Sequence, residues 1–217
     1  MSARLEGWGR LIDRSQPVRF SFDGKRYRGF LGDTLASALL ASGRLVMGRS
    51  FKYHRPRGPV AAGVEEPNAL VGLGTGARFE PDTRATTVEL FDGLTAKSQN
   101  AWPSVDVDVM AVNQLVARFL PAGFYYKTFM APPPAWKAIY EPFIRKSAGL
   151  GRAPKEPDAD SYEYLYAHFD VVVVGGGVAG LAAAKAAAAT GVKVLVLEQA
   201  AHWGGRTPVD TRADGCL

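Results

Sequence analysis

Residues 170–198 read DVVVVGGGVAGLAAAKAAAATGVKVLVLE, and this stretch decides how the chain is organised. The apolar, β-rich run Val171–Val174 predicts one buried strand of a parallel sheet. An alanine-rich helix is predicted to follow as far as about Thr190, and a second buried strand, Val192–Leu197, ends at Glu198. The order of strand, helix and strand indicates a Rossmann-type βαβ unit.

The turn between the first strand and the helix has the pattern G-x-G-x-x-G, formed by Gly175, Gly177 and Gly180. Gly175 permits the tight turn, Gly177 lets the backbone approach a pyrophosphate, and Gly180 allows close helix–strand packing. The helix N-terminus offers unpaired N–H groups to the phosphates. Glu198 is placed to accept a hydrogen bond from a ribose hydroxyl, which favours NAD or FAD over NADP. An ordinary glycine-rich turn explains the pattern less well, because every part of a dinucleotide-binding unit occurs at the required spacing.

The composition is that of a soluble globular protein. The chain has 217 residues, of which 47% are hydrophobic and 22% are charged. Its longest apolar stretches are shorter than the roughly 20 residues of a membrane span. The N-terminus lacks the apolar core of a secretory signal, so we expect a cytoplasmic protein. The net charge of +5 does not by itself indicate a nucleic-acid partner, and the single cysteine, Cys216, excludes an internal disulfide or a cysteine-ligated cluster within one chain.

The N-terminal region begins with a predicted β-hairpin. Val18–Phe22 and Lys25–Phe30 alternate apolar and polar residues on either side of Asp23-Gly24. An Asp-Gly pair between two such runs is a strong hairpin signal. A hairpin followed by a packed helix is how a β-grasp domain begins.

That helix has the sequence LASALLAS, and we expect Asp33 or Thr34 to cap it. Later strands of the same α+β domain are predicted at Ala69–Leu73 and Thr86–Phe91, where apolar residues alternate or cluster.

Between the helix and the later strands lies a basic loop, residues 43–63. Its basic residues are Arg44, Arg49, Lys52, His54, Arg55 and Arg57. Two interpretations stay open: a loop that binds an anion, a nucleotide or a partner, or a solvated basic loop. Pro56 and Pro59 argue against regular structure. A metal role for His54 is disfavoured, because no cysteine, aspartate or second histidine accompanies it at ligand spacing.

Residues 98–165 differ in composition from both flanking regions. Helical spacing at Ala111–Leu120 places Val112, Leu115, Val116 and Phe119 on one face. An aromatic cluster follows, consisting of Phe124, Tyr125, Tyr126, Phe129, Trp136, Tyr140 and Phe143. Such aromatics fill a core, dock one domain on another or form a subunit interface, and the sequence leaves these alternatives open. Residues 149–160 have the composition of a linker.

The predicted organisation is therefore α+β followed by α/β. A β-grasp domain occupies residues 1–97, a helical and aromatic connector with a linker occupies 98–165, and a Rossmann-type unit occupies 166–217. A complete dinucleotide-binding domain needs further strands, and the residues after Glu198 show no strand pattern. We therefore expect an incomplete domain and a fragment of a longer protein.

The segment after Glu198 reads QAAHWGGRT. Its glycine pair resembles flavin- and NAD-binding proteins of the two-dinucleotide-binding group, in which these glycines let the chain turn back over the nucleotide. Arg206 either reaches a phosphate there or belongs to a plain loop.

Six stretches of the sequence together carry a more specific resemblance. They are FDGKRYRGFLGDTLASALLASG (22–43), GRSFKYHRPRG (48–58), EEPNALVGLG (65–74), AVNQLVARFLPAGFYYKTFM (111–130), YEPFIRKSAGLGRAP (140–154) and the nucleotide-binding stretch. Together they resemble the alpha subunit of heterotetrameric sarcosine oxidase, in order, from about residue 4 to 206. A looser resemblance extends to multi-subunit amine, opine and cyanide-forming dehydrogenases.

The resemblance implies a β-grasp domain similar to [2Fe–2S] ferredoxin domains, here without cluster cysteines, followed by an NAD-binding domain. It implies a complex with beta, gamma and delta subunits that demethylates N-methylglycine to glycine and passes electrons from FAD to FMN to oxygen. The one-carbon unit goes to tetrahydrofolate or leaves as formaldehyde. FAD and the amine-oxidising site belong to the beta subunit, FMN lies at the alpha–beta boundary, and the family's C-terminal folate-binding domain is absent from this sequence.

Carried onto this chain, the resemblance implies NAD contacts in two groups. They are Gly175, Gly177, Ala179 and Gly180 for the phosphates, and Glu198, Gln199 and Ala200 around the adenosine ribose, with Gly205 and Arg206 where the chain turns back. The family often has threonine directly after the glycine pair, whereas Arg206 precedes Thr207 here. No catalytic residue and no metal ligand are assigned. Two alternatives stay open: the equivalent subunit of another FAD-dependent amine, opine or proline dehydrogenase, and a fragment that binds no cofactor.

Overall fold

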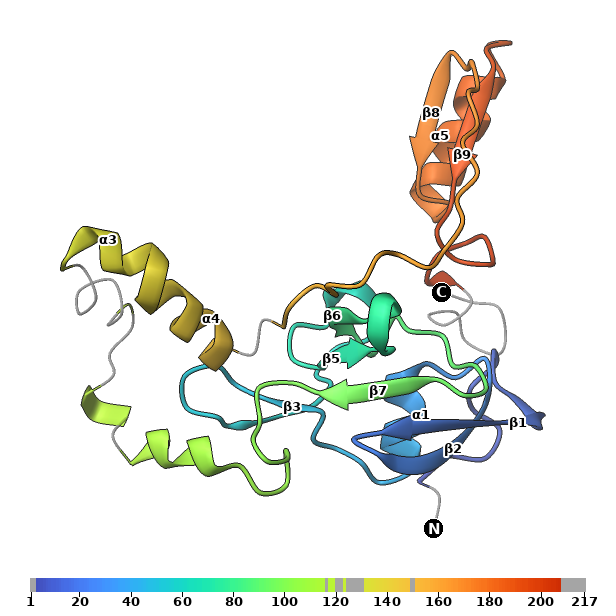
Figure 1. The fold of residues 1–217 in the computed structure, drawn as a ribbon. Helices are drawn as coiled ribbons and strands as arrows, with labels where there is room; N and C mark the ends of the chain where they lie inside the picture. Colours follow the sequence, from blue (N-terminus) through green and yellow to red (C-terminus); the bar gives the residue numbers. More distant parts are fainter. Residues whose placement is uncertain (1–2, 116, 120–122, 124–130, 149–150, 208–217) are drawn as a thin grey trace. The chain divides into compact units, whose positions relative to one another are not determined.

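The computed structural model describes residues 3–115, 117–119, 123, 131–148 and 151–207 (Figure 1). The chain divides into two compact units. Unit 1 comprises Met1–Glu6 and Ile12–Ala159, and unit 2 comprises Gly7–Leu11 and Asp160–Leu217.

The hairpin predicted around Asp23-Gly24 is confirmed. β1 (Asp13–Phe22) and β2 (Lys25–Leu31) pair antiparallel, with Phe22 opposite Lys25. Asp23 and Gly24 have φ angles of 50° and 73°. Positive φ at both central residues is the geometry of the two-residue turn that Asp-Gly favours.

Both strands belong to a five-stranded sheet in the order β2–β1–β7–β5–β6 (Figure 1). The remaining strands are β5 (Leu70–Leu73), β6 (Glu80–Arg84) and β7 (Thr95–Ser98). β7 runs parallel to β1 and antiparallel to β5, which pairs antiparallel with β6. An N-terminal hairpin whose first strand pairs in parallel with a strand from the end of the domain is the β-grasp arrangement, so the predicted α+β fold is confirmed.

The helix α1 (Leu35–Ala41) begins where the sequence predicts, and Thr34 is its cap. The Ser37 amide donates to Thr34 Oγ1 at 3.2 Å, and the Thr34 amide donates to Ser37 Oγ at 3.0 Å. This reciprocal pair satisfies two N–H groups at the helix start. Asp33, the other candidate cap, is fully buried and forms an ion pair with Arg4.

The core of unit 1 lies between α1 and the sheet. Its buried residues are Val18, Phe20, Phe22, Leu35, Ala36, Ala38, Leu39, Met47, Ala69, Val71, Ala85, Val88, Leu90, Leu94 and Ala96. The apolar positions of the predicted hairpin and helix thus face one another.

The strand predicted at Thr86–Phe91 is wrong. Val88 and Leu90 are buried, as the alternation of the sequence implies. Their backbone groups, however, bond to the start of α1: Leu35 N donates to Val88 O, and Leu90 N donates to Asp33 O, each at 2.9 Å. Alternating burial arises here from packing beside a helix terminus, and the preceding residues form β6 instead.

The prediction that the basic loop lacks regular structure, based on Pro56 and Pro59, is wrong, because the loop contains a short pair of strands. β3 (Gly48–Arg49) and β4 (Pro56–Arg57) form a short antiparallel pair. Proline is tolerated because each strand of a two-stranded pair has one edge without a ladder. Two 3-10 turns, η1 (Gly63–Glu65) and η2 (Gly76–Arg78), lie before β5 and β6.

The helix predicted at Ala111–Leu120 is also wrong. The chain forms two 3-10 segments, η3 (Val109–Gln114) and η4 (Ala117–Phe119). Val112 and Leu115, which were expected on one face of that helix, are 56% and 80% exposed.

Among the described residues that come next, three segments are helical. They are α3 (Pro133–Ala135), the π-helical turn η5 (Trp136–Tyr140) and α4 (Glu141–Ala148). Of the predicted aromatic cluster, Phe124, Tyr125, Tyr126 and Phe129 lie outside the described residues. Phe143 is 66% exposed, so it does not fill a core of unit 1. The described residues of the predicted linker, 151–160, have no helix or strand.

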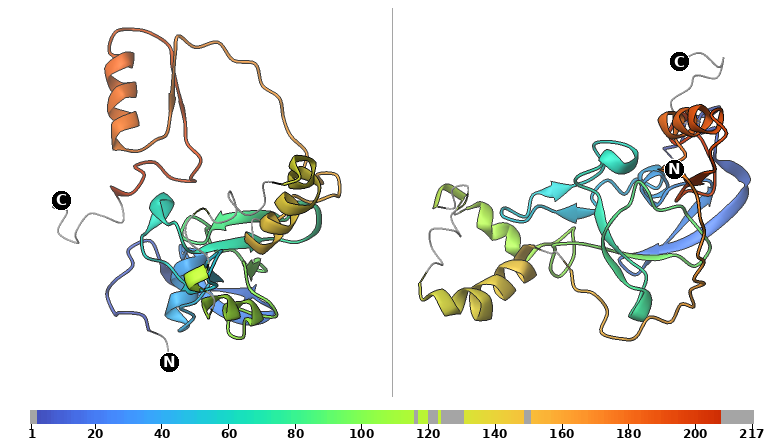
Figure 2. Two further views of the ribbon diagram at one scale, coloured as in Figure 1. Left: turned by 90° about the vertical axis from the view of Figure 1, so that its left-hand side faces the viewer. Right: turned by 90° about the horizontal axis from the view of Figure 1, so that it is seen from above.

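In unit 2 the predicted βαβ unit is confirmed. β8 (Val171–Val174) and β9 (Val194–Leu197) pair in parallel, and α5 (Val178–Ala188) lies on one face of them (Figure 2). The expectation of fully buried strands is wrong, because Val172 and Val174 are 53% and 81% exposed. Among the described residues of unit 2, no second helix covers the other face of these strands. No helix among the described residues is long and apolar enough to cross a membrane.

Candidate dinucleotide-binding site

The turn from β8 into α5 is closed by glycines in close contact. Gly175 has a φ of 102°, and its amide donates to Leu197 O at 2.8 Å. A Cβ at Gly180 would lie 1.9 Å from Gly175 O, well inside van der Waals contact. Gly175 therefore makes the turn and Gly180 the close packing, as the motif predicts.

Gly177 has a different environment. It is the N-cap of α5, with extended backbone angles and no side-chain capping bond. A Cβ placed there would have no neighbour within 4 Å. The first turn of α5, which includes the exposed Ala179, thus begins beside open space, where its N–H groups and the helix dipole favour an anion.

Glu198 follows β9 and closes the loop around this turn. Its carboxylate accepts hydrogen bonds from Gly176 N at 2.6 Å and from Ala200 N at 2.9 Å. These backbone donors, first Ala200 and then Gly176, lower the pKa of Glu198 below its ordinary value. The predicted ribose ligand is therefore an ionised acceptor that also fixes the loop.

The segment after Glu198 turns back to the glycine turn. Gly204 N donates to Gly176 O at 2.8 Å, and Gly204 forms a parallel bridge with Gly177. A Cβ at Gly205 would lie 3.2 Å from Gly177 Cα, so a larger residue would crowd the N-cap. The glycine pair thus brings the chain back to the N-cap of α5, and its passage over a nucleotide stays a prediction.

Two residues of this turn, Gly176 and Trp203, were not predicted from the sequence. A Cβ at Gly176 would lie 2.4 Å from the Trp203 ring, so the indole covers the middle glycine. An aromatic residue directly before the glycine pair was the signal available for this contact. Gln199, Ala200 and Arg206 are all exposed.

The glycine turn and the helix N-terminus offer backbone N–H groups that suit the phosphates of a dinucleotide. The described residues include no group of three or more histidine, cysteine, aspartate or glutamate side chains that could hold a metal ion.

Two protein families match separate parts of the chain. Residues 15–101 match the 2Fe-2S iron-sulfur cluster binding domain, and residues 173–216 match the NAD(P)-binding Rossmann-like domain. The only cysteine of the sequence is Cys216, outside the first match. Residues 15–101 therefore provide no thiolate for a [2Fe–2S] cluster, and the residues present do not fit that group.

Curated relatives match nearly the whole chain. Sarcosine oxidase subunit alpha of Rhizobium meliloti (strain 1021) is 55% identical over 201 residues, which are 93% of this chain and 20% of that protein. The resemblance to sarcosine oxidase alpha subunits is confirmed. Sarcosine oxidase subunit alpha of Corynebacterium sp. (strain U-96) is 33% identical over 202 residues, 91% of this chain and 16% of that protein.

The chain thus spans a fifth or less of the length of these two relatives. Among solved structures, L-proline dehydrogenase from P. horikoshii is similar, with a TM-score of 0.45 and 17% identity. The similarity covers 94% of this chain and 28% of that one.

Proposed function

We propose that this chain is part of the NAD-binding alpha subunit of a sarcosine oxidase complex. The observation that carries the proposal is the 55% identity to one sarcosine oxidase alpha subunit over 93% of this chain. The complex would oxidise the CH–NH bond of N-methylglycine and release glycine, with tetrahydrofolate as the acceptor of the one-carbon unit.

In this proposal the dinucleotide held by unit 2 is NAD. The phosphates would lie at the start of α5, beside Gly175, Gly177, Ala179 and Gly180. Glu198, with Gln199 and Ala200, would surround the adenosine ribose, and its ionised carboxylate supports a free 2′-hydroxyl over a 2′-phosphate. Gly205 and Arg206 would lie where the chain returns. NAD itself would supply a hydride-accepting nicotinamide when bound, while this chain's residues bind and orient it.

The proposal assigns redox chemistry to other parts of the complex. FAD and the amine-oxidising site would belong to the beta subunit and FMN to the alpha–beta boundary, with gamma and delta subunits completing the assembly. Within this chain we propose a β-grasp domain at 1–97, a connector at 98–165 and the NAD-binding unit from 166. Because unit 1 lacks cysteines, its β-grasp domain would serve assembly rather than electron transfer.

Substrate turnover by the assembled complex tests this function. The full-length subunit would be co-produced with its three partner subunits, and oxygen uptake measured with N-methylglycine, L-proline and an opine. We expect N-methylglycine to give a kcat/KM at least about tenfold above the other two, a difference of about 1.4 kcal/mol in transition-state binding. Preference for proline or an opine would instead assign the chain to another amine dehydrogenase.

A further inference from the structure

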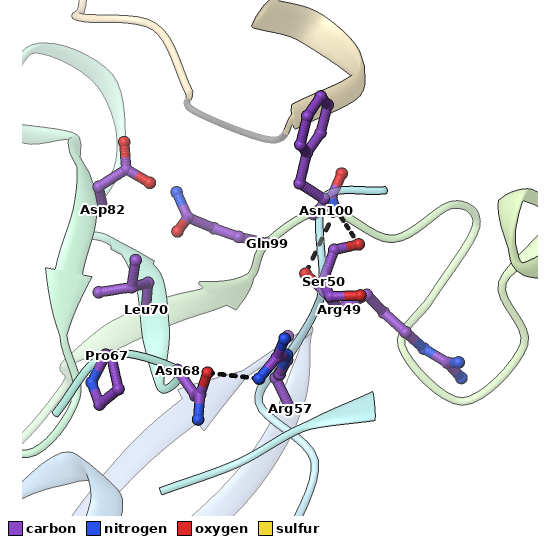
Figure 3. Close-up of a pocket in the computed structure, with 11 residues that line it drawn as sticks. Arg49, Ser50, Arg57, Pro67, Asn68, Leu70, Asp82, Gln99 and Asn100 are labelled. Carbon is purple, nitrogen blue, oxygen red and sulfur yellow. Dashed lines mark hydrogen bonds between the residues drawn. The ribbon is translucent and has the colours of Figure 1, made fainter. Parts of the chain in front are cut away.

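Unit 1 contains a cavity of about 230 Å³ between the β3–β4 pair and the strands β5, β6 and β7 (Figure 3). Its polar lining comes from four separate segments: Ser50 and Arg57 of the basic loop, Asn68 before β5, Asp82 of β6, and Gln99 with Asn100 after β7. Figure 3 shows Asp82 on one side of the cavity and Arg57 on another. None of these residues belongs to the NAD-binding unit.

Two residues with left-handed backbone line this cavity. Among the described residues, four that are not glycine have positive φ: Asp23, His54, Asp82 and Asn100. Asp23 is explained by its hairpin turn. Asp82, at 57°, and Asn100, at 56°, line the cavity, and His54 lies in the basic loop that forms one wall. Such strain persists where the surrounding structure holds it, and it concentrates at binding sites.

Hydrogen bonds within the protein hold the walls of the cavity in place. Asn100 Nδ2 donates to Ser50 O at 2.8 Å, which joins the end of β7 to the basic loop. Arg49 donates to Val105 O and to His54 O, each at 2.9 Å. These bonds direct its guanidinium group away from the cavity (Figure 3). The cavity is therefore built before a ligand arrives, which lowers the entropy cost of binding.

Two opposite charges remain available to a ligand. Arg57 donates to the neutral Asn68 side chain at 2.8 Å, and within the described part of the chain it has no ion-pair partner. Asp82 is half-buried, also without an ion pair among these residues. Burial raises the pKa of Asp82, only partly offset by a hydrogen bond with Gln99. A cation in the cavity would stabilise the Asp82 carboxylate.

We propose that this cavity binds a small zwitterion, a free α-amino acid whose ammonium group contacts Asp82 and whose carboxylate contacts Arg57. The amide side chains of Asn68 and Gln99 offer further donors and acceptors to the two ends. Phe51 and Leu70 supply apolar lining for a short side chain. The proposal concerns unit 1 alone and does not depend on the NAD site or on the substrate of the complex.

Calorimetric titration of the 217-residue chain tests the proposal with four probes. Glycine and L-alanine carry both charges, acetate carries only the carboxylate, and methylammonium only the cation. We expect saturable binding of glycine or L-alanine, with each half-ligand at least about tenfold weaker, because it leaves one charged contact unmade. Acetate binding as tight as glycine would reassign the cavity to anions. Absence of amino-acid binding would overturn the proposal in favour of a partner's side chain or of no ligand.

Charge-neutralising variants locate the site. Asp82→Asn suits the left-handed backbone, because asparagine tolerates positive φ, and Arg57→Gln replaces an exposed side chain. Each should weaken glycine binding about tenfold or more, whereas Glu89→Gln and Arg28→Gln, exposed positions outside the cavity, should leave it unchanged. Wild-type affinity in Asp82→Asn or Arg57→Gln contradicts the proposal. The half-ligand comparison on the unaltered chain decides the matter if a variant fails to fold.

Discussion

Gly177 and Gly180 belong to one motif, yet their surroundings give them opposite tolerance for a side chain. At Gly180 a methyl group would overlap Gly175 O, which is backbone and cannot move aside cheaply. At Gly177 the same methyl group would meet nothing within 4 Å. Gly180 is thus required by the packing of the turn, whereas the open space beside Gly177 leaves room for a bound phosphate.

This contrast predicts different effects of the same substitution. Gly180→Ala should destabilise the βαβ unit by about 1–3 kcal/mol, the usual cost of forcing extra atoms into a packed contact. Gly177→Ala should destabilise it by less, about 0.5–1 kcal/mol, because alanine meets no clash there but is a poorer N-cap than glycine. Amide hydrogen exchange of Val171–Val174 would report both. Equal protection of these amides in the two variants would contradict the assignment.

At the scale of elements, one carboxylate organises the segment before β5. Glu66 is fully buried and accepts four backbone hydrogen bonds. The donors are Val60 and Ala61 at 2.7 Å, Asn68 at 2.6 Å and Ala69 at 3.1 Å. Burial alone would raise the pKa of Glu66, but the four donors together lower it below the ordinary value.

A pH-dependent stability follows from that pKa. A carboxyl group with a lowered folded pKa stabilises the fold above its unfolded pKa, about 4.5, and this contribution is lost as the pH falls through the folded value. Glu66→Gln should therefore cost about 1.5–3 kcal/mol at pH 7, because an amide cannot accept all four bonds, and less at pH 3. Urea unfolding at both pH values measures the difference.

The exposed Glu89→Gln is the matched control, and it should leave the stability at pH 7 almost unchanged. A Glu66→Gln variant as stable as the parent chain at pH 7 would show that the four contacts are not maintained in solution. If the stability difference between Glu66→Gln and the parent chain were as large at pH 3 as at pH 7, the charge of the Glu66 carboxylate would not be its cause.

Elements with local signals were predictable, and elements set by tertiary contacts were not. The Asp23-Gly24 turn, the Thr34 cap and the glycine turn after β8 each specify a conformation within a few residues. Val88 and Leu90 alternate like a strand, but their partner is a helix terminus far away in sequence. The cavity beside Asp82 was missed for the same reason, because its lining comes from segments that only the fold brings together.

At the scale of the whole molecule, the two units differ in their cores and in their exposed groups. Unit 1 has a complete core between α1 and the sheet but no cysteine for a cluster. Unit 2 has an accessible helix N-terminus and an ionised Glu198, while one face of its two strands stays exposed. We therefore propose that this chain anchors a nucleotide in a larger oxidoreductase complex.

The NAD content of the purified full-length complex tests that claim most directly. Extracted NAD and flavins would be quantified for the parent protein, for Gly177→Val and for the control Ala186→Val, which adds the same side chain on an exposed face of α5. We expect about one NAD per alpha subunit in the parent and control, and loss of NAD from Gly177→Val with flavin content unchanged. NAD retained in Gly177→Val, or absent from the parent complex, would contradict it.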